Sequence, residues 1–219
     1  MKKIISGLVS VMIAGMAFNT SAYAGEGMSE AHAHIGHVMT SWNDTPSQHG
    51  LLPVAMKDAG IAAAHAALAA KSPNDLAAMK LHARHVRHAI DSSYEASGPG
   101  TGYGLIKAAN GGIGHATLAS KSKGASDAVK VHTEHAVTSL NNAIARSRMA
   151  LYEAQAVLIA TSAGQAAAHA AKMAELTQAA VNGVDANGDG GISWHAHEGG
   201  LNVASQHMGI MMDAEGMKH

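Results

Sequence analysis

The chain has 219 residues with 15 Lys and Arg against 16 Asp and Glu, so its formal charge at pH 7 is −1. This even balance, with basic residues scattered along the chain, excludes the positive surface typical of nucleic-acid binding. Cysteine is absent, which excludes disulfides, thiolate metal sites and covalent c-type haem. The 16 histidines remain as abundant potential ligands, and they gain charge together in mild acid.

Residues 1–24 have the pattern of a secretory signal peptide. Two lysines precede an apolar stretch from Ile4 to Phe18, and a small-residue cleavage site ends at Ala24. The apolar stretch is shorter than the roughly 20 residues needed to span a bilayer, and no later segment is expected to be long and apolar enough to do so. We therefore expect a periplasmic or secreted protein with no membrane insertion after removal of the signal.

Helical periodicity and capping residues predict helices throughout the rest of the chain. The expected helices cover residues 29–42, 54–71, 75–90, 105–121, 126–161, 165–181 and 201–212. No segment alternates apolar and polar residues as a strand does. Short polar links join residues 54–71 to 75–90 and residues 105–121 to 126–161, so each pair should form an antiparallel αα-hairpin. The expected fold is all-α, with a helical bundle at residues 25–181 that is built from two repeated αα-hairpins. A loop and a short C-terminal helix at residues 182–219 complete a C-terminal helix–loop–helix.

A histidine pattern occurs twice at a constant offset, which indicates an internal repeat of about fifty residues. His65, Lys71, Ser72, His82 and His85 recur in the same register as His115, Lys121, Ser122, His132 and His135. The repeat units are expected at about residues 50–97 and 100–147, one for each hairpin. A duplicated unit that keeps its imidazoles points to a role for these side chains in binding.

The hairpin geometry predicts that the repeated histidines converge. His65 and His82 are equally far from the turn near Pro73, so they should lie at the same height. His85 is three residues after His82 and shares its helix face. The same reasoning groups His115, His132 and His135, although one shared centre remains an alternative to two separate sites. Less specific candidates are His37, His88, His169 and His207.

Three imidazoles with an open fourth position suit Zn²⁺, Cu²⁺, Ni²⁺ or Co²⁺. The favoured function is therefore the binding, buffering or delivery of a transition metal by an exported histidine-rich protein. An alternative uses the same six histidines to hold b-type haem for electron transfer to a redox partner protein. A third interpretation is a structural or pH-responsive helical protein. No catalytic residues are indicated, because the His-Glu-x-x-His and Gly-x-Ser-x-Gly motifs are both missing.

The segment 185–198 resembles the calcium-binding loop of EF-hand and dockerin proteins. Asp185, Asn187 and Asp189 stand at the first, third and fifth ligand positions, and Ser193 stands at the ninth. The twelfth position, where the family has a bidentate Glu, is Ala196, and the nearest carboxylate is Glu198. The resemblance implies a calcium site with ligands at Asp185, Asn187, Asp189 and Ser193, and Glu198 is the candidate for the missing carboxylate. A degenerate loop that serves only as a turn is the alternative.

Overall fold

The computed structural model describes residues 29–218, so the predicted signal peptide lies outside the described residues. Within that range the protein contains seven α-helices, one short 3-10 helix and no strand, which confirms the all-α prediction. The elements are α1 Glu30–Met39, η1 Pro46–Gln48, α2 Leu51–Ala70, α3 Leu76–Ile90, α4 Leu105–Lys121, α5 Asp127–Ile159, α6 Ala163–Asn182 and α7 Leu201–Ala214.

Hydroxyl and carboxylate caps determine where four of these helices begin. The side chains of Ser29, Asp75, Ser126 and Ser162 each accept a hydrogen bond from the backbone N–H three residues ahead. Such caps stabilise a helix by about 1 kcal/mol because they satisfy an otherwise free donor. α2 has no side-chain cap and begins at Leu51, three residues before the expected start, with Pro53 inside its first turn.

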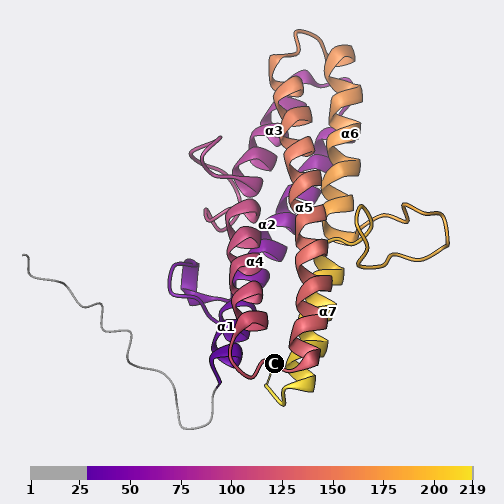
Figure 1. Cartoon of the computed structure of the whole chain (residues 1–219). Coiled ribbons are helices and arrows are strands. Elements are labelled where there is room, and N and C mark those ends of the chain that lie inside the picture. The colour runs from indigo at the N-terminus through magenta and orange to yellow at the C-terminus, as the bar shows by residue number, and fades with distance from the viewer. Residues whose placement is uncertain (1–28, 219) are drawn as a thin grey trace, which may run out of the picture.

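Two helices run through both halves of the molecule. Figure 1 shows α5 extending along most of the bundle, with α3 and α6 beside one half and α4 and α7 beside the other. α2 also serves both halves, because its residues 52–59 pack in one hydrophobic core and residues 62–69 pack in a second. The two cores are therefore joined by α2 and α5, while the remaining helices each belong mainly to one of them.

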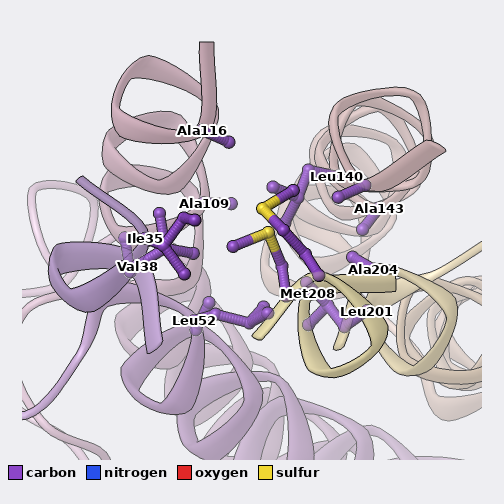
Figure 2. Close-up of a cluster of buried hydrophobic side chains, with 14 of the residues drawn as sticks. Ile35, Val38, Leu52, Ala109, Ala116, Leu140, Ala143, Leu201, Ala204 and Met208 are labelled. Carbon is purple, nitrogen blue, oxygen red and sulfur yellow. The ribbon is translucent and has the colours of Figure 1, made fainter. Parts of the chain in front are cut away.

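The two cores differ in the size of their side chains. The core beside α1, α4 and α7 contains large buried residues such as Leu140, Met208 and Met211 (Figure 2). The core between α2, α3, α5 and α6 is mostly alanine, with Met79, Ile90 and other larger residues between them. Small side chains let the helices approach closely, and this brings polar groups at the core edge within reach of one another.

A buried carboxylate holds the glycine-rich link between α3 and α4. Asp58 of α2 is fully buried and accepts hydrogen bonds from Thr101 N–H at 2.7 Å, Thr101 Oγ1 at 2.6 Å and Gly104 N–H at 3.0 Å. Gly104 has φ 88°, a conformation that glycine adopts at little cost. This contact fixes the start of α4 against α2.

α2 packs inside the bundle, although its length and apolar composition would also suit a membrane-spanning helix. It is the one helix of residues 29–218 that is long and apolar enough to cross a membrane by length and composition, with mean hydropathy 1.2 over the best window. This corrects the expectation that no segment after the signal peptide is long and apolar enough to cross a membrane. Nearly half of that window, 44%, is buried inside the bundle, which is ordinary for a helix packed mainly against α3, α4 and α6.

Candidate metal centres

Nine histidines form three triads, and each triad joins two helices. The candidate ligand atoms of each triad all lie within 4.8 Å of one another. We name them site 1 (His34, His37, His115), site 2 (His65, His82, His85) and site 3 (His132, His135, His207). In every site a His-x-x-His pair on one helix faces a single histidine on another, so α1 pairs with α4, α3 with α2, and α5 with α7.

The helix pattern explains why these imidazoles stand at the edge of the core. The residue after each triad histidine is buried. The residue just before the second histidine of each pair is half-buried or exposed, as Gly36, Arg84 and Glu134 show. Ile35, Ala116 and Met208 directly follow triad histidines, and Figure 2 shows them among the buried side chains between the helices. A neighbour on a helix points about 100° away, so burying it leaves the histidine half-buried on the flank.

The three sites share the same nitrogen geometry. In site 1, Nδ1 of His115 lies 3.0 Å from Nδ1 of His34 and 3.4 Å from Nδ1 of His37. In site 2, Nδ1 of His65 lies 3.0 Å from Nδ1 of His82 and 3.3 Å from Nδ1 of His85.

In site 3, Nδ1 of His207 lies 3.0 Å from Nδ1 of His132. Its ring centroid is 4.6 Å from that of His135, close to the 4.7 and 4.5 Å of the equivalent ring pairs in sites 1 and 2. The same arrangement thus occurs on three different helix pairs.

Hydrogen bonds alone cannot satisfy these nitrogens. A ring nitrogen of a neutral imidazole carries either one proton or one lone pair, so it makes one hydrogen bond as donor or acceptor. Nδ1 of His115 and Nδ1 of His65 each face two other Nδ1 atoms at 3.0–3.4 Å. In site 3, Nδ1 of His135 is buried and has no hydrogen-bond partner. A bound cation would accept lone pairs from all three nitrogens at once.

The spacing suits a first-row metal ion. At Zn–N distances of about 2.0–2.1 Å, a tetrahedral ion holds two of its nitrogens about 3.3–3.4 Å apart. The observed separations of 3.0–3.4 Å in sites 1 and 2 need only small side-chain adjustments to reach that geometry. Three nitrogen ligands leave the fourth position free for water or another donor.

The surroundings also favour the neutral form of six of the nine imidazoles, which is the form that binds metal. The pKa is lowered from 6.5 in six triad members, foremost because burial removes solvent from the charged form and then because the neighbouring imidazoles repel a proton. They are His37, His65, His85, His115, His135 and His207. For His115 and His207 the pKa falls to about 4.

The structure brings together one of the two predicted groups. His65, His82 and His85 converge across the α2/α3 hairpin, as the distance from the turn predicts. The other group is divided, because His115 belongs to site 1 while His132 and His135 belong to site 3. The hairpin argument did not include α1 and α7, and these helices supply the histidines that complete both triads.

Two of the three added histidines carry a sequence pattern that could have marked them as candidates. His34 and His37 have the same His-x-x-His spacing as His82 and His85, so that motif occurs three times in the triads. His207 has no such neighbour, and only the packing of α7 against α5 reveals its role. His88, another candidate, is buried and its Nδ1 hydrogen-bonds the Glu95 carbonyl at 2.8 Å, which is a structural contact.

A fourth helix pair carries an incomplete version of the same arrangement. Nδ1 of His169 on α6 lies 2.6 Å from Oε2 of Glu153 on α5. Ala154 follows Glu153 and Val157 follows Ala156, and both following residues are buried. The residues after the two histidines of each His-x-x-His pair are buried in the same way. Glu153 and Ala156 therefore occupy the positions of the first and second histidines of such a pair.

The predicted calcium ligands fall into two hydrogen-bonded groups on a loop that projects from the bundle (Figure 1). The Asp185 carboxylate accepts from the N–H groups of Gly188 at 2.7 Å and Gly190 at 2.9 Å, and Asn187 Oδ1 accepts from Asp189 N–H at 2.9 Å. Calcium binding by this loop stays a prediction.

The other two predicted calcium ligands lie at the base of that loop. Ser193 Oγ donates to the buried Glu198 carboxylate at 2.5 Å. The loop also returns to the end of α6, where Val184 N–H donates to the Glu198 carbonyl at 3.0 Å. Glu198 is thus held inside the fold, whereas Asp185, Asn187 and Asp189 are exposed.

A three-imidazole site can bind a divalent transition metal and present its open position to an external ligand. Each triad lacks a carboxylate member within the described residues, so the sites favour ions that accept nitrogen ligands over Mg²⁺ or Ca²⁺.

Comparisons of the chain with protein-family models, with curated proteins and with solved structures find no match.

Proposed function

We propose that this protein binds three divalent transition-metal ions, one at each histidine triad, and serves to buffer or carry them. The observation that carries this proposal is the recurrence of one nitrogen arrangement on three helix pairs, each with two Nδ1 atoms 3.0 Å apart across the pair. A half-buried histidine kept for packing has no reason to meet two others in this way. The recurrence favours a common ligand.

The chemistry of the triads narrows the choice of ion. Neutral imidazole is a borderline ligand that suits Zn²⁺, Cu²⁺, Ni²⁺ and Co²⁺. The affinity order among these ions places Cu²⁺ highest, so the physiological ion depends on supply as well as on geometry. The signal-like residues 1–24 support a role in the periplasm or outside the cell, where such a protein would control free metal.

The geometry gives less support to the haem alternative. A haem bound by two histidines lies between them, with one axial nitrogen on each side of the iron. The paired Nδ1 atoms of 3.0 Å separation in each triad are already within contact distance and leave no space for a porphyrin. An ion at the centre of each triad needs no such space.

Metal stoichiometry tests the proposal directly. Zn²⁺ titrated into the chelator-treated protein, followed by calorimetry and by elemental analysis after desalting, should give three equivalents per chain. His82→Ala, His115→Ala and His207→Ala should each reduce this to two, since each removes one ligand from a different site. His49→Ala is the matched control, because His49 is exposed and belongs to no triad.

Two results would contradict the proposal. One is a wild-type protein that retains less than one equivalent of Zn²⁺, Cu²⁺, Ni²⁺ or Co²⁺ after desalting. The other is a set of triad variants that lose no more metal than His49→Ala. Circular dichroism of each variant distinguishes a lost ligand from a lost fold, because removal of one half-buried imidazole should leave helix content unchanged.

A further inference from the structure

The chain has two tryptophans, and each lies against a histidine triad. The Trp42 ring centroid is 4.8 Å from that of His37 and 4.4 Å from that of His115 in site 1. The Trp194 ring stacks on His135 in site 3, with centroids 4.0 Å apart and an interplanar angle of 19°. In both sites the indole contacts the second histidine of the His-x-x-His pair.

Site 2 has no equivalent contact. Its second paired histidine is His85, and the ring contacts described for the site within residues 29–218 are those among His65, His82 and His85 themselves. Both tryptophans are already placed at the other sites, so no indole is left for site 2. The three sites therefore share their ligand geometry but differ in what restrains their ligands.

Backbone hydrogen bonds hold Trp42 in position. Its N–H donates to the Gln48 carbonyl at 3.3 Å, and its carbonyl accepts from Thr45 Oγ1 at 2.8 Å and from Thr45 N–H at 3.2 Å. Thr45 is buried. The turn after α1 is thus a fixed structure that directs the indole onto His37 and His115.

The segment that carries Trp194 is fastened to α5, the helix of His132 and His135. Asn142 Nδ2 donates to the His195 carbonyl at 2.9 Å, and Asn142 Oδ1 accepts from His197 N–H at 3.0 Å. The buried Arg146 guanidinium donates to the carbonyls of Glu198 at 2.9 Å and Gly199 at 2.8 Å. Trp194 is therefore held against His135 by contacts that do not involve the metal ligands.

We infer that Trp42 and Trp194 are positioning residues that restrain the histidines of sites 1 and 3, so that these sites retain their ions while site 2 exchanges its ion rapidly. This inference rests on the proposed metal-binding function. Release of an ion requires the imidazoles to rotate away one after another, and an indole packed on a ring opposes that rotation. An aromatic pair contributes enough beyond its buried area to slow release by roughly 2- to 13-fold.

The location of the ligands in the chain also differs between the sites. Site 2 lies within one hairpin, with its histidines on adjacent helices of the chain, whereas sites 1 and 3 join segments that are distant in sequence. Site 2, which no indole restrains, is the position from which an external ligand or a receiving protein would take the ion. Sites 1 and 3 would act as the reserve.

Cobalt release tests this inference, since Co²⁺ bound by imidazoles absorbs visible light and quenches a nearby indole. The protein loaded with three equivalents of Co²⁺ is mixed with excess EDTA in a stopped-flow instrument, and absorbance and tryptophan fluorescence are recorded together. We expect one third of the absorbance to be lost in a fast phase without fluorescence recovery. The remaining two thirds should be lost more slowly, with recovery.

Variants assign the phases. His65→Ala should remove the fast phase and leave the slow loss unchanged. Trp42→Ala and Trp194→Ala should each move one third of the absorbance from the slow phase to a faster one, whereas Trp42→Phe should keep much of the restraint. Circular dichroism of the tryptophan variants is the control that checks whether they keep their helices.

The inference is overturned if the three ions leave at one rate, if fluorescence recovers during the fast phase, or if both tryptophan-to-alanine variants release cobalt at wild-type rates. These outcomes differ from failure of the proposed function, in which no cobalt absorption develops. The wild-type measurement is decisive by itself, because the fluorescence signal comes only from the two sites that carry an indole.

Discussion

The incomplete site between α5 and α6 can be tested by adding the ligand that it lacks. Ala156 lies one helical turn from Glu153 and occupies the position of the second paired histidine, while His169 already lies 2.6 Å from Glu153. Ala156→His should complete a triad of two histidines and one carboxylate, a ligand set found in zinc enzymes. We expect the variant to bind four equivalents of Zn²⁺ where the wild type binds three.

The energetic effect can be estimated from the structure. Ala156 is partly exposed, so the new side chain meets no closed core, and the metal-free variant should lose only about 0.5 kcal/mol through the lower helix propensity of histidine. When free Zn²⁺ is 100-fold above the Kd of the new site, binding adds about 2.7 kcal/mol to the free energy of unfolding. That corresponds to an extra rise in Tm of roughly 5–11 °C in a protein of this size.

Calorimetric titration and thermal unfolding with and without Zn²⁺ measure both quantities. Ile159→His is the matched control, because it adds a histidine to the same helix at a position that is 69% exposed and points away from Glu153. The interpretation of Glu153 and His169 as an incomplete triad is refuted by one result. In it, Ala156→His binds three ions and zinc raises its Tm no more than it raises the Tm of Ile159→His.

Three further predictions concern pH and stability. Burial lowers the pKa of His115 and His207 from 6.5 to about 4, so the unfolded chain binds more protons than the folded chain between these pH values. The free energy of unfolding of the metal-free protein should therefore fall as pH decreases from 6.5 to 4. Urea unfolding at several pH values measures this, and a flat profile would contradict it. Zinc should dissociate over the same acidic range, since protons compete for the imidazoles, and an occupancy independent of pH between 7.5 and 4.5 would exclude histidine ligation. Asp58→Ala leaves three donors of the α3–α4 link without their acceptor. We expect it to lower the free energy of unfolding in urea by about 3 kcal/mol, and a loss below about 1 kcal/mol would show that this carboxylate does not hold the link.

The local features of the chain were predictable from sequence because they depend on neighbouring residues. Serine and aspartate caps, helix periodicity and short polar turns gave the helices within a few residues, since each rests on backbone geometry over one or two turns. Site 2 was predictable for the same reason. A short turn between two helices fixes the height of His65 relative to His82 and His85.

Sites 1 and 3 depend on which helices pack together, and only the tertiary structure decided this. The buried faces of these helices are rich in alanine, and such faces fit many partners with similar burial of apolar area. The sequence therefore contains little to show that His115 meets α1 or that His207 meets α5. The positions of Trp42 and Trp194 are also tertiary, because loops that are fixed by Thr45, Asn142 and Arg146 direct them onto histidines. The sequence determined that imidazoles occur in metal-binding spacing, and long-range helix packing determined which of them form each site.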